Sequence, residues 1–189
     1  MIKERLNEAF SVNRQIFEDQ ALLDKIDMCI NTISTTLSSG GKVLFCGNGG
    51  SAADAQHLAA ELSGKFYFDR SPLPAEACHV NTSFLTAVSN DYSFEKAYAR
   101  YIEGIAFDGD VLVAISTSGN SENIIQAAIQ AHKQGVKVIG MTGKSGGKLL
   151  QHSDILINIP SESTPRIQEA HILIGHIICE QVEKNLFSK

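Results

Sequence analysis

Apolar residues near the start of the chain recur every three or four positions, which is the spacing of an amphipathic helix. The pattern runs from residue 2 to residue 37 and ends before Gly40 and Gly41. A break near residues 19–21 would divide it into a helical hairpin. A long amphipathic arm can pack on its own domain or on a partner, and we predict that residues 1–38 pack in an oligomer.

Beyond residue 41, short apolar runs alternate with helical patterns. The runs predict buried strands, and they lie at residues 42–46, 75–80, 110–116, 136–141 and 155–159. Helices are expected at residues 51–63, 83–89, 94–106, 121–134 and 166–186. This alternation is typical of a parallel sheet covered on both faces. The sequence therefore predicts an α/β fold: one domain over residues 1–189, with a doubly wound five-stranded parallel sheet, an N-terminal helical arm and a long C-terminal helix.

Composition excludes several classes of protein. Apolar residues make up 43% of the chain and charged residues 20%, which is enough for a packed core. With 16 basic and 21 acidic residues the formal charge is −5, so the broad basic surface of a nucleic-acid binder is missing. No apolar run approaches the roughly 20 residues of a membrane helix, and the charged first ten residues do not read as a secretory signal. We expect a cytoplasmic protein that binds neither nucleic acid nor membrane, with its four cysteines reduced.

Two loops that follow predicted strands carry most of the chemical signal. Residues 47–51 read Gly-Asn-Gly-Gly-Ser, and residues 116–121 read Ser-Thr-Ser-Gly-Asn-Ser. Glycine lets the backbone approach a ligand closely, and a helix N-terminus favours an anion. We expect Ser51 and Ser121 to cap the helices that follow. Either loop alone could be an ordinary turn, but two at one edge of a parallel sheet favour a small-molecule phosphomonoester.

Neither loop fits a nucleotide-binding motif. The first does not match G-x-G-x-x-G, and both lack the Gly-Lys-Ser/Thr ending of a Walker motif. Gly143-Lys144-Ser145 has that ending without the upstream glycine spacing. We therefore expect no nucleotide cofactor.

Acid–base and metal-ligand candidates lie on two predicted helices. His57 and Glu61 are four residues apart and share a helix face. The closing helix carries Gln168, His171 and His176 among apolar residues. Burying a polar group there has an energetic cost, so these side chains are candidates for a functional role. Gln168 can pair by spacing with either histidine. These side chains could hold a zinc ion, transfer protons without a metal, or be solvated helix-surface residues, and the residues alone leave these alternatives open.

Four segments, taken in order, resemble the phosphoheptose isomerase family of sugar-isomerase (SIS) domain proteins. They are CGNGGSAADAQHLAAELSG at 46–64, SNDYSFE at 89–95, ISTSGNSENI at 115–124 and RIQEAHILIGH at 166–176. The resemblance covers nearly the whole chain and implies a flavodoxin-like SIS fold. It implies an aldose–ketose isomerase that converts sedoheptulose 7-phosphate to D-glycero-D-manno-heptose 7-phosphate through an ene-diol, the first step of heptose synthesis for lipopolysaccharide or capsule. It also implies a homotetramer with active sites between subunits.

The resemblance assigns roles at matching positions. Glu61 would be the general base and His176 the general acid, and one zinc ion per subunit would be held by His57, Glu61, Gln168 and His176. Lys65 stands where the family often has Arg, which keeps the charge but loses the bidentate fork. The residues that would bind the phosphosugar are Asn48, Gly49, Gly50, Ser51, Glu61, Asn90, Asp91, Ser116, Thr117, Ser118, Ser121 and Gln168.

The alternative function is a non-catalytic SIS scaffold that binds a replication initiator or another protein partner. Such proteins resemble the isomerases but are expected to lose the catalytic carboxylate and histidine, and this chain has both Glu61 and His176. A sugar-phosphate-sensing regulator is a weaker interpretation, because no DNA-binding helix-turn-helix extension is visible.

Overall fold

Five parallel strands form a single sheet in the computed structural model, which describes residues 1–188. The strands are β1 (Val43–Cys46), β2 (Ala75–Ala77), β3 (Val111–Ile115), β4 (Lys137–Thr142) and β5 (Ile155–Asn158). Their order across the sheet is β2-β1-β3-β4-β5, so the chain reverses direction across the sheet once, beside β1. This is the flavodoxin-like order, and it places ligand-binding loops at the carboxyl ends of β1 and β3.

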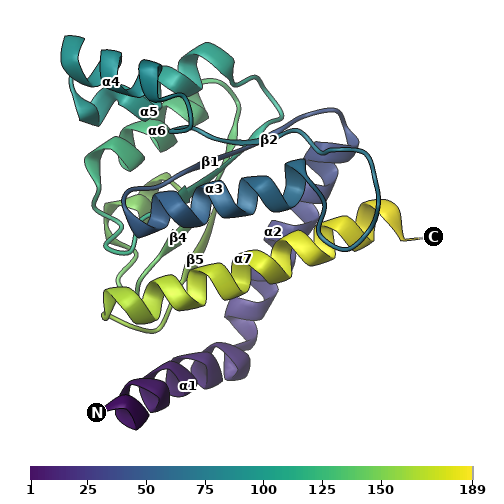
Figure 1. Cartoon of the computed structure of the whole chain (residues 1–189), viewed down its shortest axis with the longest axis vertical. Coiled ribbons are helices and arrows are strands. Elements are labelled where there is room, and N and C mark those ends of the chain that lie inside the picture. The colour runs from purple at the N-terminus through teal and green to yellow at the C-terminus, as the bar shows by residue number, and fades with distance from the viewer. Residues whose placement is uncertain (189) are drawn as a thin grey trace.

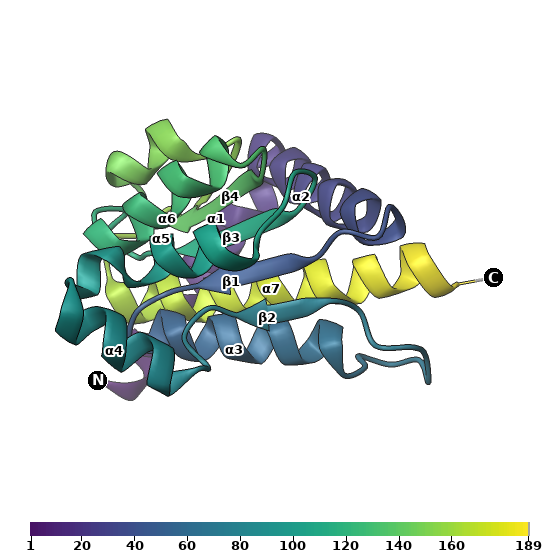
Figure 2. The same ribbon diagram turned by 90° about the horizontal axis from the view of Figure 1, so that it is seen from above.

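Helices cover both faces of the sheet (Figures 1 and 2). One face packs against α2 (Gln20–Ser38), α3 (Gly50–Ser63) and α7 (Thr164–Phe187). The other packs against α5 (Phe94–Ile105), α6 (Glu122–Lys133) and the 3₁₀ helix η1 (Gly147–His152), with α4 (Thr82–Asp91) lying on α5. Side chains of β1 alternate between the two cores: Val43 and Phe45 face the first, Leu44 and Cys46 the second. The predicted α/β class and the five-stranded sheet are confirmed.

The N-terminal arm breaks into two helices near residues 19–21, as the sequence allows, but the helices meet at a bend and do not form the expected hairpin (Figure 1). It consists of α1 (Ile2–Glu18) and α2, and Asp19 separates them. The Asp19 carboxylate accepts a hydrogen bond from the Leu22 N–H at 3.0 Å and so caps α2. In Figure 1, α1 projects beyond the sheet near the start of α7. The packing of residues 1–38 in an oligomer stays a prediction.

Several element boundaries differ from expectation: β2, for example, ends at Ala77 rather than near residue 80. Helix α4 extends to Asp91 rather than ending near residue 89, so Asn90 and Asp91 lie on its last turn. The 3₁₀ helix η1 was not expected, because two consecutive glycines of positive φ, Gly146 and Gly147, interrupt any longer helical pattern there. Within the described residues, no helix combines the length and apolar content needed to cross a membrane.

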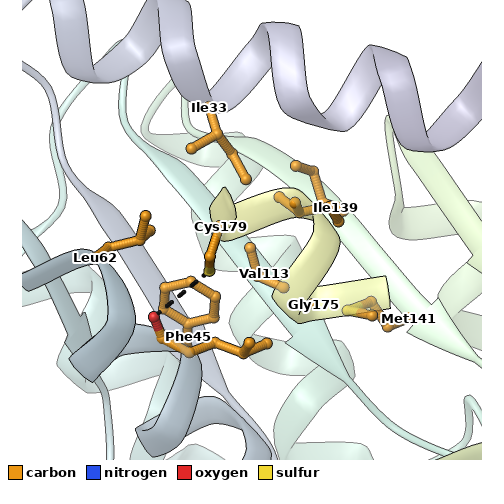
Figure 3. Close-up of a pocket in the computed structure, with 10 residues that line it drawn as sticks. Ile33, Phe45, Leu62, Val113, Ile139, Met141, Gly175 and Cys179 are labelled. Carbon is orange, nitrogen blue, oxygen red and sulfur yellow. Dashed lines mark hydrogen bonds between the residues drawn. The ribbon is translucent and has the colours of Figure 1, made fainter. Parts of the chain in front are cut away.

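Helices α3 and α7 lie side by side and approach each other closely at Gly175 (Figures 1 and 3). A Cβ at Gly175 would lie 2.6 Å from Leu58 Cδ1, so the small residue permits this contact. Figure 3 shows the apolar cavity beneath it, which encloses about 10 Å³ and is lined by residues such as Phe45, Val113 and Cys179. A space of that size is at the lower limit for one water and holds no substrate.

The four cysteines, Cys29, Cys46, Cys78 and Cys179, are free and buried, as expected. Burial raises the pKa of the Cys29 and Cys179 thiols to about 12. Thiols with such pKa values stay protonated at neutral pH and are poor nucleophiles and metal ligands. The reactive groups of this protein therefore have to be side chains other than these thiols.

Candidate active site

His57, Glu61 and His176 converge where α3 meets α7. His57 Nε2 lies 3.2 Å from Glu61 Oε1 and 2.8 Å from His176 Nε2. One ligand atom from each of the three side chains lies within 4.8 Å of the others. The four-residue spacing on α3 and the close approach of α7 at Gly175 together produce this arrangement. We call these three residues the triad.

The triad is open to solvent. The side chain of His57 is 49% exposed and that of Glu61 is 27% exposed. The Phe66 ring packs edge-on against His176 with 6.1 Å between ring centroids. Two imidazole nitrogens at hydrogen-bond distance need one donor and one acceptor, or a cation that both can face. The cluster can therefore exchange protons or hold a metal ion, and it remains accessible to a small molecule.

Gln168 lies beside the loop that follows β1. A Cβ at Gly50 would lie 2.4 Å from Gln168 Nε2, so any side chain there would displace the amide. Gln168 precedes His176 by eight residues, which is about 12 Å along the helix axis. Its observed neighbour is Gly50 at the start of α3, and its role as a metal ligand stays a prediction.

His171 does not share that surface with Gln168. Its side chain is fully buried, and Nε2 donates to the Thr142 carbonyl oxygen at 3.1 Å. Burial lowers the pKa of His171 to about 4, although the hydrogen bond to Thr142 opposes this shift. The pair of Gln168 with His171, which the spacing allowed, is not formed.

The loop after β1 turns into α3 at Gly49. This residue has φ +54° and is the N-cap of the helix, so α3 begins at Gly50. The expected N-cap, Ser51, is wrong: it lies inside the first turn and is 4% exposed, because glycine takes the left-handed conformation two residues earlier. The Tyr98 hydroxyl donates to the Gly47 carbonyl oxygen at 2.6 Å and fixes the beginning of the loop.

The second loop gathers hydroxyl groups at the end of β3. Ser121 is the N-cap of α6 as expected, but its side chain makes no capping bond; instead the Ser116 hydroxyl donates to Ser121 Oγ at 3.1 Å. Gly119, with φ +66°, packs so closely that a Cβ would lie 2.0 Å from the Gly146 carbonyl oxygen. Cys46 of β1 pairs in register with Ala114 of β3, so both loops leave the same edge of the sheet. We call residues 116–121 the hydroxyl loop.

Two of the predicted site residues, Asn90 and Asp91, lie away from the triad. Asn90 and Asp91 are exposed at the end of α4, which packs on the opposite side of the sheet from α3 and α7. The two side chains contact each other: Asn90 Nδ2 donates to Asp91 Oδ1 at 3.0 Å. Lys65 is exposed just after α3 ends. Within the described residues, a single chain therefore does not bring Asn90 and Asp91 together with the triad.

A buried ion pair secures the segment that follows α3. Glu183 of α7 is 1% exposed and accepts hydrogen bonds from the N–H groups of Phe66, Tyr67 and Phe68 at 2.9, 2.6 and 3.0 Å. Arg70 Nε adds a fourth bond at 2.7 Å. Burial alone would raise the pKa of Glu183, but these donors outweigh it and hold the pKa below its usual range.

Arg70 in turn caps the C-terminal end of α3. Its guanidinium donates to the carbonyl oxygens of Glu61, Leu62 and Gly64 at 3.1, 2.9 and 3.2 Å. These carbonyl groups lie at the end of the helix and have no hydrogen-bond donor within it. A cation that binds them therefore stabilises the helix. The Arg70–Glu183 ion pair therefore ties together the two helices that carry the triad. Neither residue belongs to a motif in the sequence; the signal for Glu183 is a charged residue on the apolar stripe of α7.

Comparison with known proteins places this chain among SIS-domain proteins. The SIS domain family model matches residues 6–143. The phosphoheptose isomerase of Sulfurimonas denitrificans is 45% identical over 186 residues, covering 98% of this chain and 95% of the relative. That of Mycobacterium tuberculosis is 51% identical over 181 residues, covering 96% and 92%.

Solved structures agree with this result. The phosphoheptose isomerase of Neisseria gonorrhoeae superposes with a TM-score of 0.90 at 39% identity, covering 97% of this chain and 100% of that one. The phosphoheptose isomerase of Francisella tularensis has a TM-score of 0.93 at 36% identity, covering 97% and 96%. The likeness spans the whole fold, including the elements that carry the triad.

Proposed function

This chain belongs to the phosphoheptose isomerase family of SIS-domain enzymes, and from that membership we propose that it converts sedoheptulose 7-phosphate to D-glycero-D-manno-heptose 7-phosphate. The reaction is an aldose–ketose isomerisation, and its product would supply heptose for lipopolysaccharide or capsule. The observation that carries the proposal for this chain is the convergence of His57, Glu61 and His176 in an accessible cluster.

The reaction needs one group that removes a carbon-bound proton and another that serves the oxygens. Glu61 presents carboxylate oxygens that are partly exposed, and we assign it the removal of the proton from C1 of the ketose and its return to C2. His176 would give a proton to the oxygen on C2 and take one from the oxygen on C1, as imidazole does near neutral pH. The ene-diol lies between these two transfers. His57 bonds both partners and so orients them.

The triad also fits a metal ion. Two imidazoles and one carboxylate are a donor set found in catalytic zinc sites, and the three ligand atoms lie within 4.8 Å of one another. We propose that His57, Glu61 and His176 hold one zinc ion per subunit, with Gln168 as the fourth ligand. When bound, such an ion polarises substrate oxygens as a Lewis acid. Glu61 then serves as both ligand and base, and tight coordination would lower its basicity.

The substrate phosphate would bind at the hydroxyl loop. Ser116, Thr117, Ser118 and Ser121 offer hydroxyl groups beside the N-terminus of α6, where backbone N–H groups favour an anion. The formal charge of the chain is −5, so net charge does not attract the phosphate and local donors must do so. Asn48, Gly49, Gly50 and Ser51 would line the sugar side of the same site.

We propose a homotetramer in which neighbouring subunits complete each site. Helix α1 supports this, because its apolar side chains Ile2, Phe10 and Phe17 are 75%, 65% and 78% exposed and need a partner surface. In such an assembly Asn90 and Asp91, which are exposed at the end of α4, would bind the sugar of a neighbouring subunit. The cytoplasmic location stays a prediction.

The scaffold alternative lacks a supporting observation. A non-catalytic protein has no need to keep Glu61, His57 and His176 at contact distances in an accessible cluster. We therefore retain the enzyme as the function that the geometry supports best.

Turnover of sedoheptulose 7-phosphate by the purified protein tests the proposal. We expect conversion to the aldose, loss of activity after thorough chelation, and recovery with added Zn²⁺. Absence of turnover in every condition, together with stoichiometric capture of a protein partner, would overturn the enzyme in favour of the scaffold. Activity that is indifferent to chelation would remove only the metal.

A further inference from the structure

Two side-chain amides join the two loops that carry the proposed phosphosugar ligands. Asn48 Nδ2 donates to Asn123 Oδ1 at 2.8 Å, and Asn123 Nδ2 donates to Asn48 Oδ1, also at 2.8 Å. Asn48 lies in the loop after β1, whereas Asn123 lies in the first turn of α6, directly after the hydroxyl loop. Two antiparallel bonds between planar amides fix both the distance and the relative orientation of the groups that they join.

Asn123 is committed to this contact. It is 3% exposed, and its Oδ1 also accepts the Ile124 N–H at 3.0 Å. Water competes poorly for hydrogen bonds in such a position, so the amide pair holds its geometry. Leaving the buried Asn123 amide without its partner would carry a desolvation cost, which makes the paired arrangement the stable one.

The pairing determines what Asn48 offers a ligand. Both polar atoms of its side chain bond to Asn123, so the side chain faces α6. A sugar at this loop would therefore meet the backbone of residues 48–50 rather than the Asn48 amide. The position of that backbone depends on the amide pair.

The loop also bridges the two layers of helices. Asn48 is held by α6 on one face of the sheet, and Gly50 begins α3 on the other face, against Gln168 of α7. The triad follows on the same α3. A shift of the loop toward or away from α6 would therefore change the distance between the hydroxyl loop and the groups that act on C1 and C2.

We propose that Asn123 is a positioning residue, which acts through Asn48 to set the separation between the loop at residues 47–50 and the hydroxyl loop. A phosphosugar bound at its phosphate by the hydroxyl loop then places its carbonyl end against the first loop and toward the triad. This inference rests on the proposed function, because it takes the two loops to bind opposite ends of one substrate. It assigns a role to a residue that does not itself touch the substrate.

The test is a double-mutant cycle with two ligands. Asn123→Ala, Asn48→Ala and the double variant are compared with wild type by calorimetric binding of sedoheptulose 7-phosphate and of inorganic phosphate, and by kcat and KM. We expect each single variant to weaken binding and kcat/KM for the sugar phosphate by about tenfold, the effect of a lost hydrogen-bonded contact. The double variant should be no worse, and the affinity for inorganic phosphate, which needs only the hydroxyl loop, should stay within about threefold of wild type.

Gln126→Ala is the matched control, because Gln126 is a half-buried amide on the same helix, whose hydrogen bond to Glu122 at 2.7 Å does not reach either loop. We expect wild-type values for it. If Asn123→Ala does not fold by circular dichroism, Asn123→Ser, which keeps a donor and acceptor in a smaller side chain, enters the same measurements.

Three results would overturn the positioning role. They are equal losses for both ligands, losses that multiply in the double variant, and an Asn48→Ala defect much larger than that of Asn123→Ala. Wild type that binds the sugar phosphate without converting it would contradict the proposed function alone, and the binding measurements would still decide the role of Asn123. Wild type that binds neither ligand would overturn both.

Discussion

Glu61 and Glu183 are two carboxylates at the contact between α3 and α7, and their surroundings are opposite. Glu183 is 1% exposed, and its oxygens accept three backbone hydrogen bonds and one from Arg70. Glu61 is 27% exposed, and its side-chain neighbour is the His57 imidazole, at 3.2 Å. A carboxylate whose lone pairs are occupied holds a fold together, whereas one with open lone pairs can accept a proton or a cation. The contact between α3 and α7 thus holds one carboxylate that stabilises the fold and another that is available for chemistry.

The largest expected effect is the loss of turnover in Glu61→Gln. The amide keeps the size of the side chain but removes the base, so kcat should fall by about a thousandfold, within the range for general-base catalysis. Sedoheptulose 7-phosphate binding should remain measurable by calorimetry, and the melting temperature should change by no more than about 2 °C. Full activity in this variant would end the assignment of Glu61 as the base.

Glu183→Gln should show the reverse pattern. It leaves the buried Arg70 guanidinium without its counter-charge, and breaking a buried ion pair costs about 3–5 kcal/mol of unfolding free energy. Urea denaturation measures this loss, and molecules that remain folded at low temperature should still turn over substrate. A variant as stable as wild type would show that the ion pair does not secure the end of α3.

The same ion pair predicts an acid-sensitive fold. The pKa of Glu183 is held below its usual value of 4.5, so its stabilisation is present above that pH and is lost as the pH falls through the pKa of the folded state. The unfolding free energy of wild type should therefore decrease below about pH 4.5, and Glu183→Gln should lose that part of the decrease. Acid titrations of wild type and Glu183→Gln check this prediction. Identical slopes of unfolding free energy against pH would contradict it.

His171 sharpens the comparison, because its charged form lacks the partners that Glu183 has. Its buried Nδ1 has no hydrogen-bond partner among residues 1–188, and burial lowers its pKa from 6.5 to about 4. The unfolded state therefore binds more protons between these pH values, so stability falls as the pH drops from 6.5 to 4, by about 3 kcal/mol. His171→Gln, whose amide can still reach the Thr142 carbonyl oxygen, should flatten that part of the curve of unfolding free energy against pH. An unchanged slope would show that His171 does not cause it.

The smallest effect is expected at a third carboxylate, Glu180 of α7. It pairs with Lys184 at 2.6 Å, but the two side chains are 28% and 42% exposed. Exposed pairs at this helical spacing contribute about 0.3–0.5 kcal/mol, so Glu180→Gln should be close to wild type in both stability and turnover. A large loss of either would mean that the burial and bonding of a carboxylate do not decide its role.

Local patterns predicted most of this molecule. Short apolar runs indicate the five buried strands, and the i, i+4 spacing of His57 and Glu61 indicates one side of the triad. The N-cap of α3 was misplaced, because the positive φ of Gly49 sets the start of the helix and a hydroxyl at residue 51 was the more familiar signal. The start of α3 depends on the backbone conformation of Gly49, and residue type alone specifies that conformation only in part.

Long-range pairs were the part that sequence reasoning could not supply. Arg70 and Glu183 are separated by 113 residues, and Asn48 and Asn123 by 75. No local periodicity links such residues. Each of them, taken alone, is of a residue type that is common in loops or helices. Their partnership arises from sheet order and from the side-by-side packing of α3 and α7.

Isomerisation in D₂O tests most directly whether Glu61 acts as an open base. A proton held on a carboxylate that is 27% exposed can exchange with solvent before it returns to carbon. The product heptose phosphate should therefore carry deuterium at C2, as measured by mass spectrometry and NMR, and Glu61→Gln should form almost none of this product. A product made at the wild-type rate without deuterium at C2 would indicate direct transfer of hydrogen between C1 and C2, and would contradict the role assigned to Glu61.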